Sequence, residues 1–282
     1  MRFSVITPSF NSASWLRLCI ASVADQGVDL QHIVQDAGST DGTLEWLGGD
    51  ARVTAFVERD QGMYDAVNRG LRRAEGDILA YLNCDEQYLP GCLQKVDAFF
   101  RAHPDVDVLF GDVVVVNSDF EYFFHRKMLV PLRYHTWVSH LSTLTCATFF
   151  RRTILDDYGL FFDARLRDVG DAEWMLRLLN RRIRMAVLRQ FTSVFTMTGE
   201  NMGAKPNAIR EIRELRASAP LLAKTLKPLL VLHHRLRRMA GGIYVQRPFS
   251  YSIYTRNSPH ARLTVEVSHP RFRWRTNEQR PQ

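Results

Sequence analysis

The sequence predicts an α/β fold in which a mostly parallel sheet is flanked by helices. Two observations support this class. Short runs of β-branched and apolar residues alternate with segments of helical periodicity through the first half of the chain, as in sheets built from strand–helix–strand units. Several of these runs also end abruptly in polar residues, which is how an open α/β sheet presents side chains to a ligand crevice.

Each expected strand is a short apolar run that stops at a turn signal. The first run ends at Pro8, and the fourth ends in the polar sequence Asn-Cys-Asp-Glu. In chain order, strands are expected at Phe3–Thr7, His32–Gln35, Val53–Val57, Ile78–Leu82 and Val106–Phe110. Extended chain is expected to continue over Asp112–Asn117, and a further strand is expected at Thr145–Arg151.

The helices are predicted from apolar residues at helical spacing. After Ser12 or Ser14, which are candidate N-caps, Leu16, Ile20 and Val23 fall on one face. The following helices are expected at Thr43–Leu47, Met63–Ala74, Gly91–Ala102 and Asp171–Arg182. Beyond about residue 200 the alternation fades, so we expect a first domain at 1–204 and a second, mainly helical region at 205–282, with a polar, flexible end over 270–282.

Composition narrows the class of protein. The 282 residues are 46% hydrophobic, enough for one large core or a core with an appendage. No apolar run approaches the ~20 residues of a membrane span. The four cysteines are scattered without a Cys-x-x-Cys pair, which fits a reduced cytosolic protein better than a disulfide framework or a zinc site. We therefore expect a cytoplasmic protein.

Charge is distributed unevenly along the chain. Residues 205–282 carry 16 basic and 4 acidic residues, a balance of +12, whereas residues 1–204 carry 21 and 26, a balance of −5. The leucine-rich part of this basic region could pack on the body, contact a second copy in a homodimer, or lie on an anionic membrane surface. Nucleic acid is disfavoured as a partner because no recognised nucleic-acid motif accompanies the charge.

The end of the fourth strand carries the most informative residues. Asp85 and Glu86 directly follow the apolar run Ile78–Leu82. Carboxylate oxygens suit Mg²⁺ or Mn²⁺, and such ions usually bind together with a substrate phosphate. The alternative is a strand followed by a solvated acidic turn.

Three upstream segments also lie at expected strand ends. They are Thr7–Asn11, the small-residue loop Asp36–Thr43, and Arg59–Gly70, in which Asp65 and Asn68 share a helix face. Each alone could be an ordinary turn or helix cap. Together with the acidic strand end they could line one pocket.

These segments resemble the family-2 nucleotide-sugar glycosyltransferases of the GT-A (Rossmann-like) fold, over roughly residues 1–200. The motifs are Thr-Pro-Ser-Phe-Asn from Thr7, Asp-Ala-Gly-Ser-Thr-Asp-Gly-Thr from Asp36, Asp-Gln-Gly-Met-Tyr-Asp-Ala-Val-Asn-Arg-Gly from Asp60, Leu-Asn-Cys-Asp-Glu from Leu82, and Gly-Asp-Ala-Glu-Trp-Met-Leu-Arg from Gly170. Their order and spacing are those of the family. Within it, the chain is most similar to bacterial enzymes of surface-polysaccharide assembly.

The resemblance implies a role for each matching position. Asp171 corresponds to the catalytic base, and Asp85 to the acid that meets the metal and the donor. Asp36 would contact a uracil-type base. The nucleotide and donor contacts as a set are Thr7, Pro8, Ser9, Asn11, Asp36, Gly38, Asp60, Asp65, Asn68, Asn83 and Asp85.

The chain departs from the family at two places. Glu86 stands where a second Asp is common, so the metal ligands expected for Mg²⁺ or Mn²⁺ are Asp85 with Glu86 as a longer replacement. Close relatives often carry His-Gln where this chain has Thr145-Cys146, so the acceptor cannot be carried over from them.

The expected function is an inverting transfer of a sugar, of the hexosyl or N-acetylhexosaminyl class, from a UDP donor to a hydroxyl of a saccharide or lipid-linked saccharide. A peripheral position on the inner face of the cell membrane would suit a lipid-linked acceptor. Two alternatives remain open: a nucleotidyltransferase, which usually carries a glycine-rich basic phosphate loop unlike Thr7–Asn11, and a catalytically silent nucleotide-sugar-binding module.

Overall fold

The structure, a computed structural model, describes residues 1–199 and 206–272. Its strands are β1 (Phe3–Ser9), β2 (Leu30–Asp36), β3 (Thr54–Val57), β4 (Ile78–Tyr81), β5 (Gln87–Tyr88), β6 (Val108–Asn117), β7 (Tyr122–Arg126), β8 (Thr148–Arg151), β9 (Met185–Met197), β10 (Phe249–Thr255) and β11 (Ser258–Val267). Its helices are α1 (Ala13–Ala24), α2 (Thr43–Leu47), α3 (Met63–Arg73), α4 (Cys92–Ala102), α5 (Arg133–Val138), a 3₁₀ turn (Thr145–Ala147), α6 (Thr153–Asp156), α7 (Gly170–Asn180), α8 (Pro206–Ala217), α9 (Leu221–Thr225) and α10 (Lys227–Ala240).

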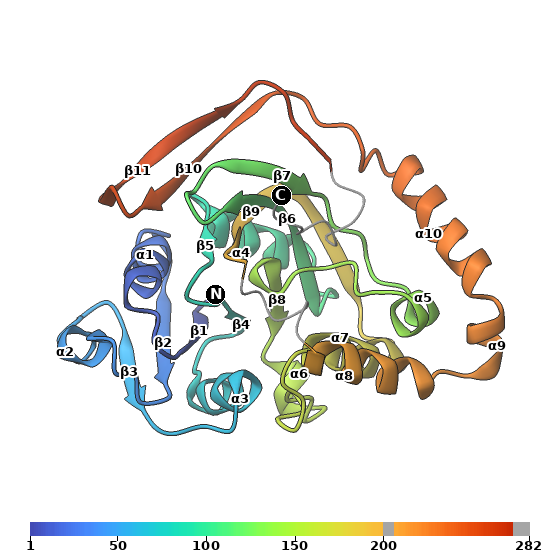
Figure 1. Ribbon diagram of the computed structural model, residues 1–282, viewed down its shortest axis with the longest axis horizontal. Helices are drawn as coiled ribbons and strands as arrows, with labels where there is room; N and C mark the ends of the chain where they lie inside the picture. Colours follow the sequence, from blue (N-terminus) through green and yellow to red (C-terminus); the bar gives the residue numbers. More distant parts are fainter. Residues whose placement is uncertain (200–205, 273–282) are drawn as a thin grey trace.

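One nine-stranded sheet organises the molecule (Figure 1). Its strand order is β3-β2-β1-β4-β8-β6-β9-β5, with β7 paired to β6 outside this path. The strands β3, β2, β1 and β4 are mutually parallel, because a helical crossover joins each of them to the next one along the chain. This half confirms the predicted α/β class, and the strands and helices expected up to Ala102 are present.

Parallel pairing fixes where the loops of this half meet. In the β1–β2 register Ser9 lies opposite Asp36, so the turns after both strands start side by side. The loop after β4 leaves the same edge, because β4 also runs parallel to β1. The carboxyl ends of β1, β2, β3 and β4 therefore form a single rim, which is where ligands bind in open α/β sheets.

The second half of the sheet is mixed. The valine-rich β6 pairs antiparallel with β7 and β8 and parallel with β9. The strand β9 was not expected from the sequence, because Arg189 and Gln190 interrupt the apolar pattern of this segment at a register shift. The large side chains of the main core, among them Phe100, Phe110 and Phe149, pack between this sheet and its helices.

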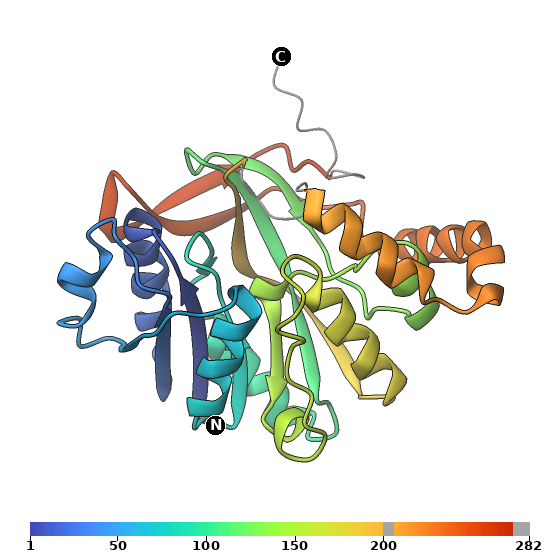
Figure 2. The same cartoon turned by 60° about the horizontal axis from the view of Figure 1, so that its bottom comes forward.

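The C-terminal region packs against the rest of the molecule at two separate places (Figure 2). The helices α8, α9 and α10 contact α5, while β10 and β11 contact α1. The expectation of a mainly helical region is therefore incomplete, because β10 and β11 form a hairpin whose Tyr254 backbone pairs with the Gln87 side chain. The expected domain boundary at 204/205 and the end from residue 273 lie outside the described residues.

Candidate active site

A cleft of about 1300 Å³ opens along the rim formed by β1 to β4. The turns after these strands form one wall, and the segment preceding α7 contributes the other. Eight of the predicted site residues line this cleft, namely Pro8, Ser9, Asn11, Gly38, Asp60, Asn83, Asp85 and Asp171. The structure therefore brings together residues that are up to 163 positions apart in the sequence.

Asp36 supports the cleft from behind. Its side chain is fully buried, and its two carboxylate oxygens accept hydrogen bonds from the hydroxyls of Ser9 and Ser39 and from the backbone N–H groups of Gly38 and Ser39, at 2.7 to 2.9 Å. Because these bonds occupy both oxygens, Asp36 holds the turns after β1 and β2 in shape and is not among the lining residues. The contact with a uracil-type base expected of Asp36 stays a prediction.

A second set of bonds locks the same two turns together. Asn11 adopts a left-handed backbone with φ of 49°, which Asn tolerates better than most residues. Its N–H donates to the Ser39 hydroxyl at 2.8 Å, and its side-chain oxygen accepts from the Thr40 N–H at 2.8 Å. Thr7 lies beneath the turn, fully buried, 2.9 Å from the His32 ring.

The loop after β3 is held by α3. Asp60 lines the cleft and accepts from the Gly62 N–H, while burial raises its pKa. Asp65 does not line the cleft; it accepts from the Gln61 N–H and pairs with Arg69 at 2.9 Å. Asn68 is buried and exchanges two hydrogen bonds with the backbone of Phe162, at 2.8 and 2.9 Å. Asp65 and Asn68 thus hold neighbouring loops and are not among the residues that line the cleft.

The two acids after β4 occupy different environments. Asp85 is partly exposed and lines the cleft, whereas Glu86 is 1% exposed, accepts from the Asn83 N–H at 2.8 Å and is not among the described lining residues. Burial raises the pKa of both carboxyls, and the neighbouring Asp85 charge raises that of Glu86 further. Cys84 between Asn83 and Asp85 is buried; its thiol donates to the Pro8 carbonyl at 3.2 Å, and burial raises its pKa.

This arrangement fits a divalent cation held by one protein carboxylate. Asp85 is a desolvated acid at the cleft wall, and a positive charge beside it would stabilise its ionised form. Mg²⁺ commonly binds through one or two carboxylates and substrate phosphates. Glu86 fits less well, because one oxygen is engaged by the backbone and the other is enclosed in the core without a hydrogen-bond partner among the described residues.

Asp171 sits in the first turn of α7, on the other wall of the cleft. Its carboxylate accepts from the Ala172 N–H at 2.7 Å and from the Tyr64 hydroxyl at 3.5 Å, and its own N–H donates to that hydroxyl at 3.1 Å. Removal of water by the surrounding protein raises its pKa to about 6, although these hydrogen bonds oppose the shift. A carboxylate in this state can take up a proton near neutral pH.

Gly170 makes this contact possible. A Cβ atom at this position would lie 2.6 Å from the ring of Tyr64, closer than carbon atoms can approach. The buried Tyr64 ring therefore fills the space that any other side chain at position 170 would need. The glycine of the Gly-Asp motif serves the placement of the aspartate that follows it.

The C-terminal region also supports Asp171. Glu211 of α8 is 4% exposed, and its carboxylate accepts from the backbone N–H groups of Arg167, Asp168 and Val169 at 3.0 to 3.1 Å. These three residues directly precede α7. Burial works against ionisation of Glu211, but the three N–H groups and Asn207 lower its pKa below the usual range. An ionised buried side chain from α8 thus shapes the wall that presents Asp171.

Several lining residues were not predicted from the sequence. Arg59 and Arg167 bring positive charge to the cleft, and Tyr64, Tyr81 and Trp15 bring aromatic surface. Two of these lie within or beside recognised motifs: Tyr64 is part of the Asp60 segment, and Arg59 directly precedes it. Tyr81 is the last residue of the apolar strand β4 and therefore looks like core.

Comparisons with known proteins agree with this geometry. The sequence model of the family described as "Glycosyl transferase family 2" matches residues 4–161. A "PGL/p-HBAD biosynthesis glycosyltransferase" of Mycobacterium tuberculosis is 28% identical over 253 residues, which are 87% of this chain and 94% of that relative.

Solved structures share the fold. The structure of S. aureus TarS 1–349 in complex with UDP-GlcNAc has a TM-score of 0.60 at 21% identity, covering 85% of this chain and 73% of the 1–349 chain. The mannosyltransferase PcManGT from Pyrobaculum calidifontis, in complex with GDP-Man and Mn²⁺, has a TM-score of 0.56 at 19% identity, covering 83% and 69%. At 21% and 19% identity, these two similarities support a shared fold only.

Proposed function

The chain belongs to glycosyl transferase family 2 and has a GT-A fold, and from this premise we propose that it transfers a sugar from a nucleotide donor to an acceptor hydroxyl with inversion at the anomeric carbon. One observation supports the proposal above all others. Asp85 and Asp171 line one cleft from different walls, and the latter is a desolvated carboxylate with a pKa of about 6. A single displacement needs two such acids, one that holds the metal ion at the donor and one that takes the proton of the acceptor hydroxyl.

The donor we propose is a UDP-sugar of the hexosyl or N-acetylhexosaminyl class. The turns after β1 and β2 offer Pro8, Ser9, Asn11 and Gly38 to the nucleoside. Arg59 supplies positive charge for the diphosphate. The TarS complex with UDP-GlcNAc supports a uridine donor, and the PcManGT complex with GDP-Man makes a guanosine donor the competitor to test against.

The proposed reaction is one displacement. The acceptor oxygen forms a bond to the anomeric carbon while the bond from that carbon to the phosphate oxygen breaks, and the nucleoside diphosphate departs with the electron pair. Asp171 takes the proton of the acceptor hydroxyl as the new bond forms. Tyr64, which donates to the same carboxylate, keeps it oriented in the cleft.

Asp85 would hold the Mg²⁺ or Mn²⁺ that the family and the Mn²⁺ complex of PcManGT suggest. Such an ion, when bound, stabilises the negative charge that builds on the leaving diphosphate. Asn83 lines the cleft beside it and offers an amide to the same region. Glu86 we assign to the support of this turn, through its bond to the Asn83 N–H.

The acceptor we propose is a saccharide or a lipid-linked saccharide of bacterial surface-polysaccharide assembly. Leu144, Thr145 and Arg167 also line the cleft, outside the turns assigned to the nucleotide. This part of the cleft is bordered by the segment in which the chain departs from its relatives. The name of the mycobacterial relative assigns that protein to PGL/p-HBAD biosynthesis.

We further propose that α9 and α10 rest on an anionic membrane surface at the inner face of the cell membrane. An exposed apolar stripe runs along them at helical spacing: Leu222, Leu226, Leu229, Leu232, Leu236 and Met239. These six side chains are between 38% and 68% exposed, which supports the membrane proposal, whereas Leu230 packs on the body against Val138, Ala219 and Ala223. Exposed basic residues interleave the stripe at Lys224, Lys227 and Arg235, whereas Arg237 and Arg238 turn toward the body.

Leucines beside lysines and arginines complement a surface of acyl chains under anionic headgroups. Among the described helices, none is long and apolar enough to cross a bilayer. The leucine stripe would therefore lie in the interface rather than span it. A second copy of the chain, the homodimer alternative, would cover the leucines but leave this concentration of positive charge without a counterpart.

A donor panel tests the transfer activity. We expect release of free UDP from one member of a panel of UDP- and GDP-sugars, dependent on Mg²⁺ or Mn²⁺ and lost on addition of EDTA. Asp85→Asn should lose this release, whereas Asp65→Asn, which changes an acid outside the cleft, should keep most of it. Binding of a nucleotide sugar without any release by the wild type would instead favour a silent binding module.

A further inference from the structure

A second, smaller cavity lies away from the cleft, between the end of β7, the loop after α5 and the helix α10. Its lining residues are Arg126, Lys127, Leu129, His140, Ser142, His234 and Arg238, none of which lines the cleft. Its volume, measured as the space open to the centre of a water molecule, is about 20 Å³, which is enough for a small polar group. Three cationic side chains and two imidazoles meet here, and no carboxylate is among the described lining residues.

One cation of this cavity, Arg126, has no ionic partner in the part of the chain that the structure describes. Arg126 contacts the Phe124 ring, 5.9 Å from its centre, and has no hydrogen bond or ion pair among the described residues. Burial and the neighbouring Arg238 lower its pKa to about 10, so it remains charged at neutral pH. Buried charges are normally paired, so a cluster of this kind calls for an anion.

Unsatisfied polar atoms point to the same conclusion. His234 is 3% exposed, and its Nδ1 has no hydrogen-bond partner; neither has the Ser142 hydroxyl. Burial, with the adjacent His140 and arginines, lowers the pKa of His234 to about 4, so its ring is neutral at pH 7. A neutral imidazole and a hydroxyl can each donate one hydrogen bond to an anionic oxygen.

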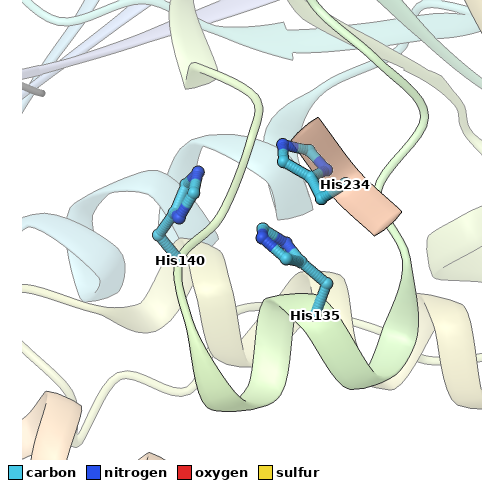
Figure 3. A group of neighbouring side chains, drawn as sticks. All are labelled: His135, His140 and His234. Atoms are coloured by element: carbon cyan, nitrogen blue, oxygen red, sulfur yellow. The ribbon is translucent and has the colours of Figure 1, made fainter. Parts of the chain in front are cut away.

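The same region contains three histidines that could suggest a metal site. The nitrogens of His135, His140 and His234 lie within 4.8 Å of one another (Figure 3). However, the rings of His135 and His234 are stacked, with centroids 3.9 Å apart and planes 17° from parallel. Lone pairs of stacked rings run side by side rather than converge, and the nitrogens of tetrahedral zinc ligands lie about 3.3 Å apart.

The surrounding charge also disfavours a cation. Arg237 and Arg238 act on both His135 and His234, and no acid contributes to the shifts of either ring. A divalent ion would add two positive charges to this environment. An anion would instead relieve the repulsion that the arginines exert on one another and on any protonated histidine.

We propose that this cavity is a binding site for a phosphate group, held chiefly by Arg126, Arg238 and His234. Arginine favours phosphate because its fork of N–H groups matches the phosphate oxygens. The phosphate could be inorganic or could belong to a lipid headgroup, because Leu232 and Leu236 are exposed on the same helix that supplies His234. The site is independent of the transfer reaction.

The test follows the histidine ring resonances of the full chain by ¹H–¹³C NMR while inorganic phosphate replaces chloride at constant ionic strength. We expect the His234 resonance, assigned with His234→Gln, to shift to saturation. Arg126→Gln should weaken this binding at least about tenfold, since it removes a charge-assisted contact, and Arg126→Lys should restore part of it. Two control variants should leave phosphate binding unchanged. Arg213→Gln removes an exposed charge from α8, and Arg59→Gln removes a charge from the cleft.

The source of the phosphate is separated with vesicles. Tighter binding to phosphatidylcholine vesicles containing phosphatidic acid than to those containing phosphatidylglycerol, abolished by Arg126→Gln, would support a lipid headgroup. Saturation by inorganic phosphate without that preference would support free phosphate. The proposal is overturned if phosphate leaves the His234 resonance unmoved, if Arg126→Gln binds as wild type, or if Zn²⁺ alone shifts the three histidines.

Discussion

Asp171 owes its chemistry to the side chains packed around it rather than to its place in a motif. The Tyr64 hydroxyl and the Ala172 N–H stabilise the ionised carboxylate, while the loss of water outweighs them and raises its pKa to about 6. The ordinary value is 3.8. The protein thus keeps one carboxylate at the cleft more basic than its exposed counterparts.

This shift predicts a pH-dependent cost in stability. Between about pH 4 and 6 the folded state binds a proton at Asp171 that the unfolded chain releases, so the free energy of unfolding falls as the pH rises through that window. Asp171→Asn removes this dependence. Urea unfolding should show the variant more stable than wild type at neutral pH and equal to it near pH 4; an equal effect at both values would contradict the assigned shift.

Gly170 gives a steric prediction at the same site. Gly170→Ala places a methyl group against the Tyr64 ring, and overpacking of this kind typically costs about 1–3 kcal/mol in unfolding free energy. Displacement of Tyr64 should also reduce kcat. The control is Gly48→Ala, because Gly48 has φ of −66° and nothing within 4 Å of an added Cβ. Equal urea midpoints for the two variants would refute the packing argument.

At the scale of elements, strand ends could be predicted well and side-chain directions could not. The apolar run before Asp85 and the motif around Asp171 indicated residues that meet in one cleft. A motif places a residue near the rim, but local hydrogen bonds decide whether it faces the ligand. That is why five expected site residues support the cleft without lining it: Thr7, Asp36, Asp65, Asn68 and Glu86.

Several elements were missed, among them β5, β7, α5 and α6, and two of the larger omissions have different physical reasons. The long strand β9 has an interrupted apolar pattern, and its pairing with β6 depends on contacts far apart in the sequence. The β10–β11 hairpin did carry a local signal, since Phe249, Tyr251 and Ile253 alternate with polar residues on either side of a short turn. The high positive charge of the region obscured that alternation.

The helix α8 links the C-terminal region to the cleft, and Glu211 is the residue to test. Glu211→Ala removes the acceptor of three backbone N–H groups, a change of about 1–3 kcal/mol for each donor left buried and unsatisfied. We expect kcat to fall with little change in donor affinity, because the loop before α7 shifts while the nucleotide turns stay in place. Glu214→Ala, an exposed position on the same helix, is the control, and matching kinetics for the two variants would exclude the role.

At the scale of the whole molecule, positive charge and exposed leucines concentrate on the C-terminal helices α9 and α10. The acidic body carries the cleft, and the basic helices α9 and α10 carry the exposed leucines. Each basic residue near an anionic bilayer adds about 1 kcal/mol of attraction. A membrane-bound orientation would deliver lipid-linked acceptors to a cleft whose donor arrives from solution.

Vesicle sedimentation tests this orientation. The wild type should sediment with vesicles containing phosphatidylglycerol, should remain in solution with pure phosphatidylcholine, and should be released by high salt. Leu229→Glu combined with Leu236→Glu should abolish sedimentation, whereas Leu263→Glu, an exposed position on the distant hairpin, should not. A dimer in solution that ignores vesicles would show that a second copy covers the stripe.

The most direct test of the proposed mechanism compares sugar transfer with donor binding in Asp171→Asn. If Asp171 is the base, the variant binds the nucleotide sugar within about twofold of wild type, while kcat falls by a factor of about 10²–10⁴, the range expected for loss of general-base catalysis. A variant that transfers sugar as fast as wild type would contradict the assignment, and with it the mechanism proposed for this cleft.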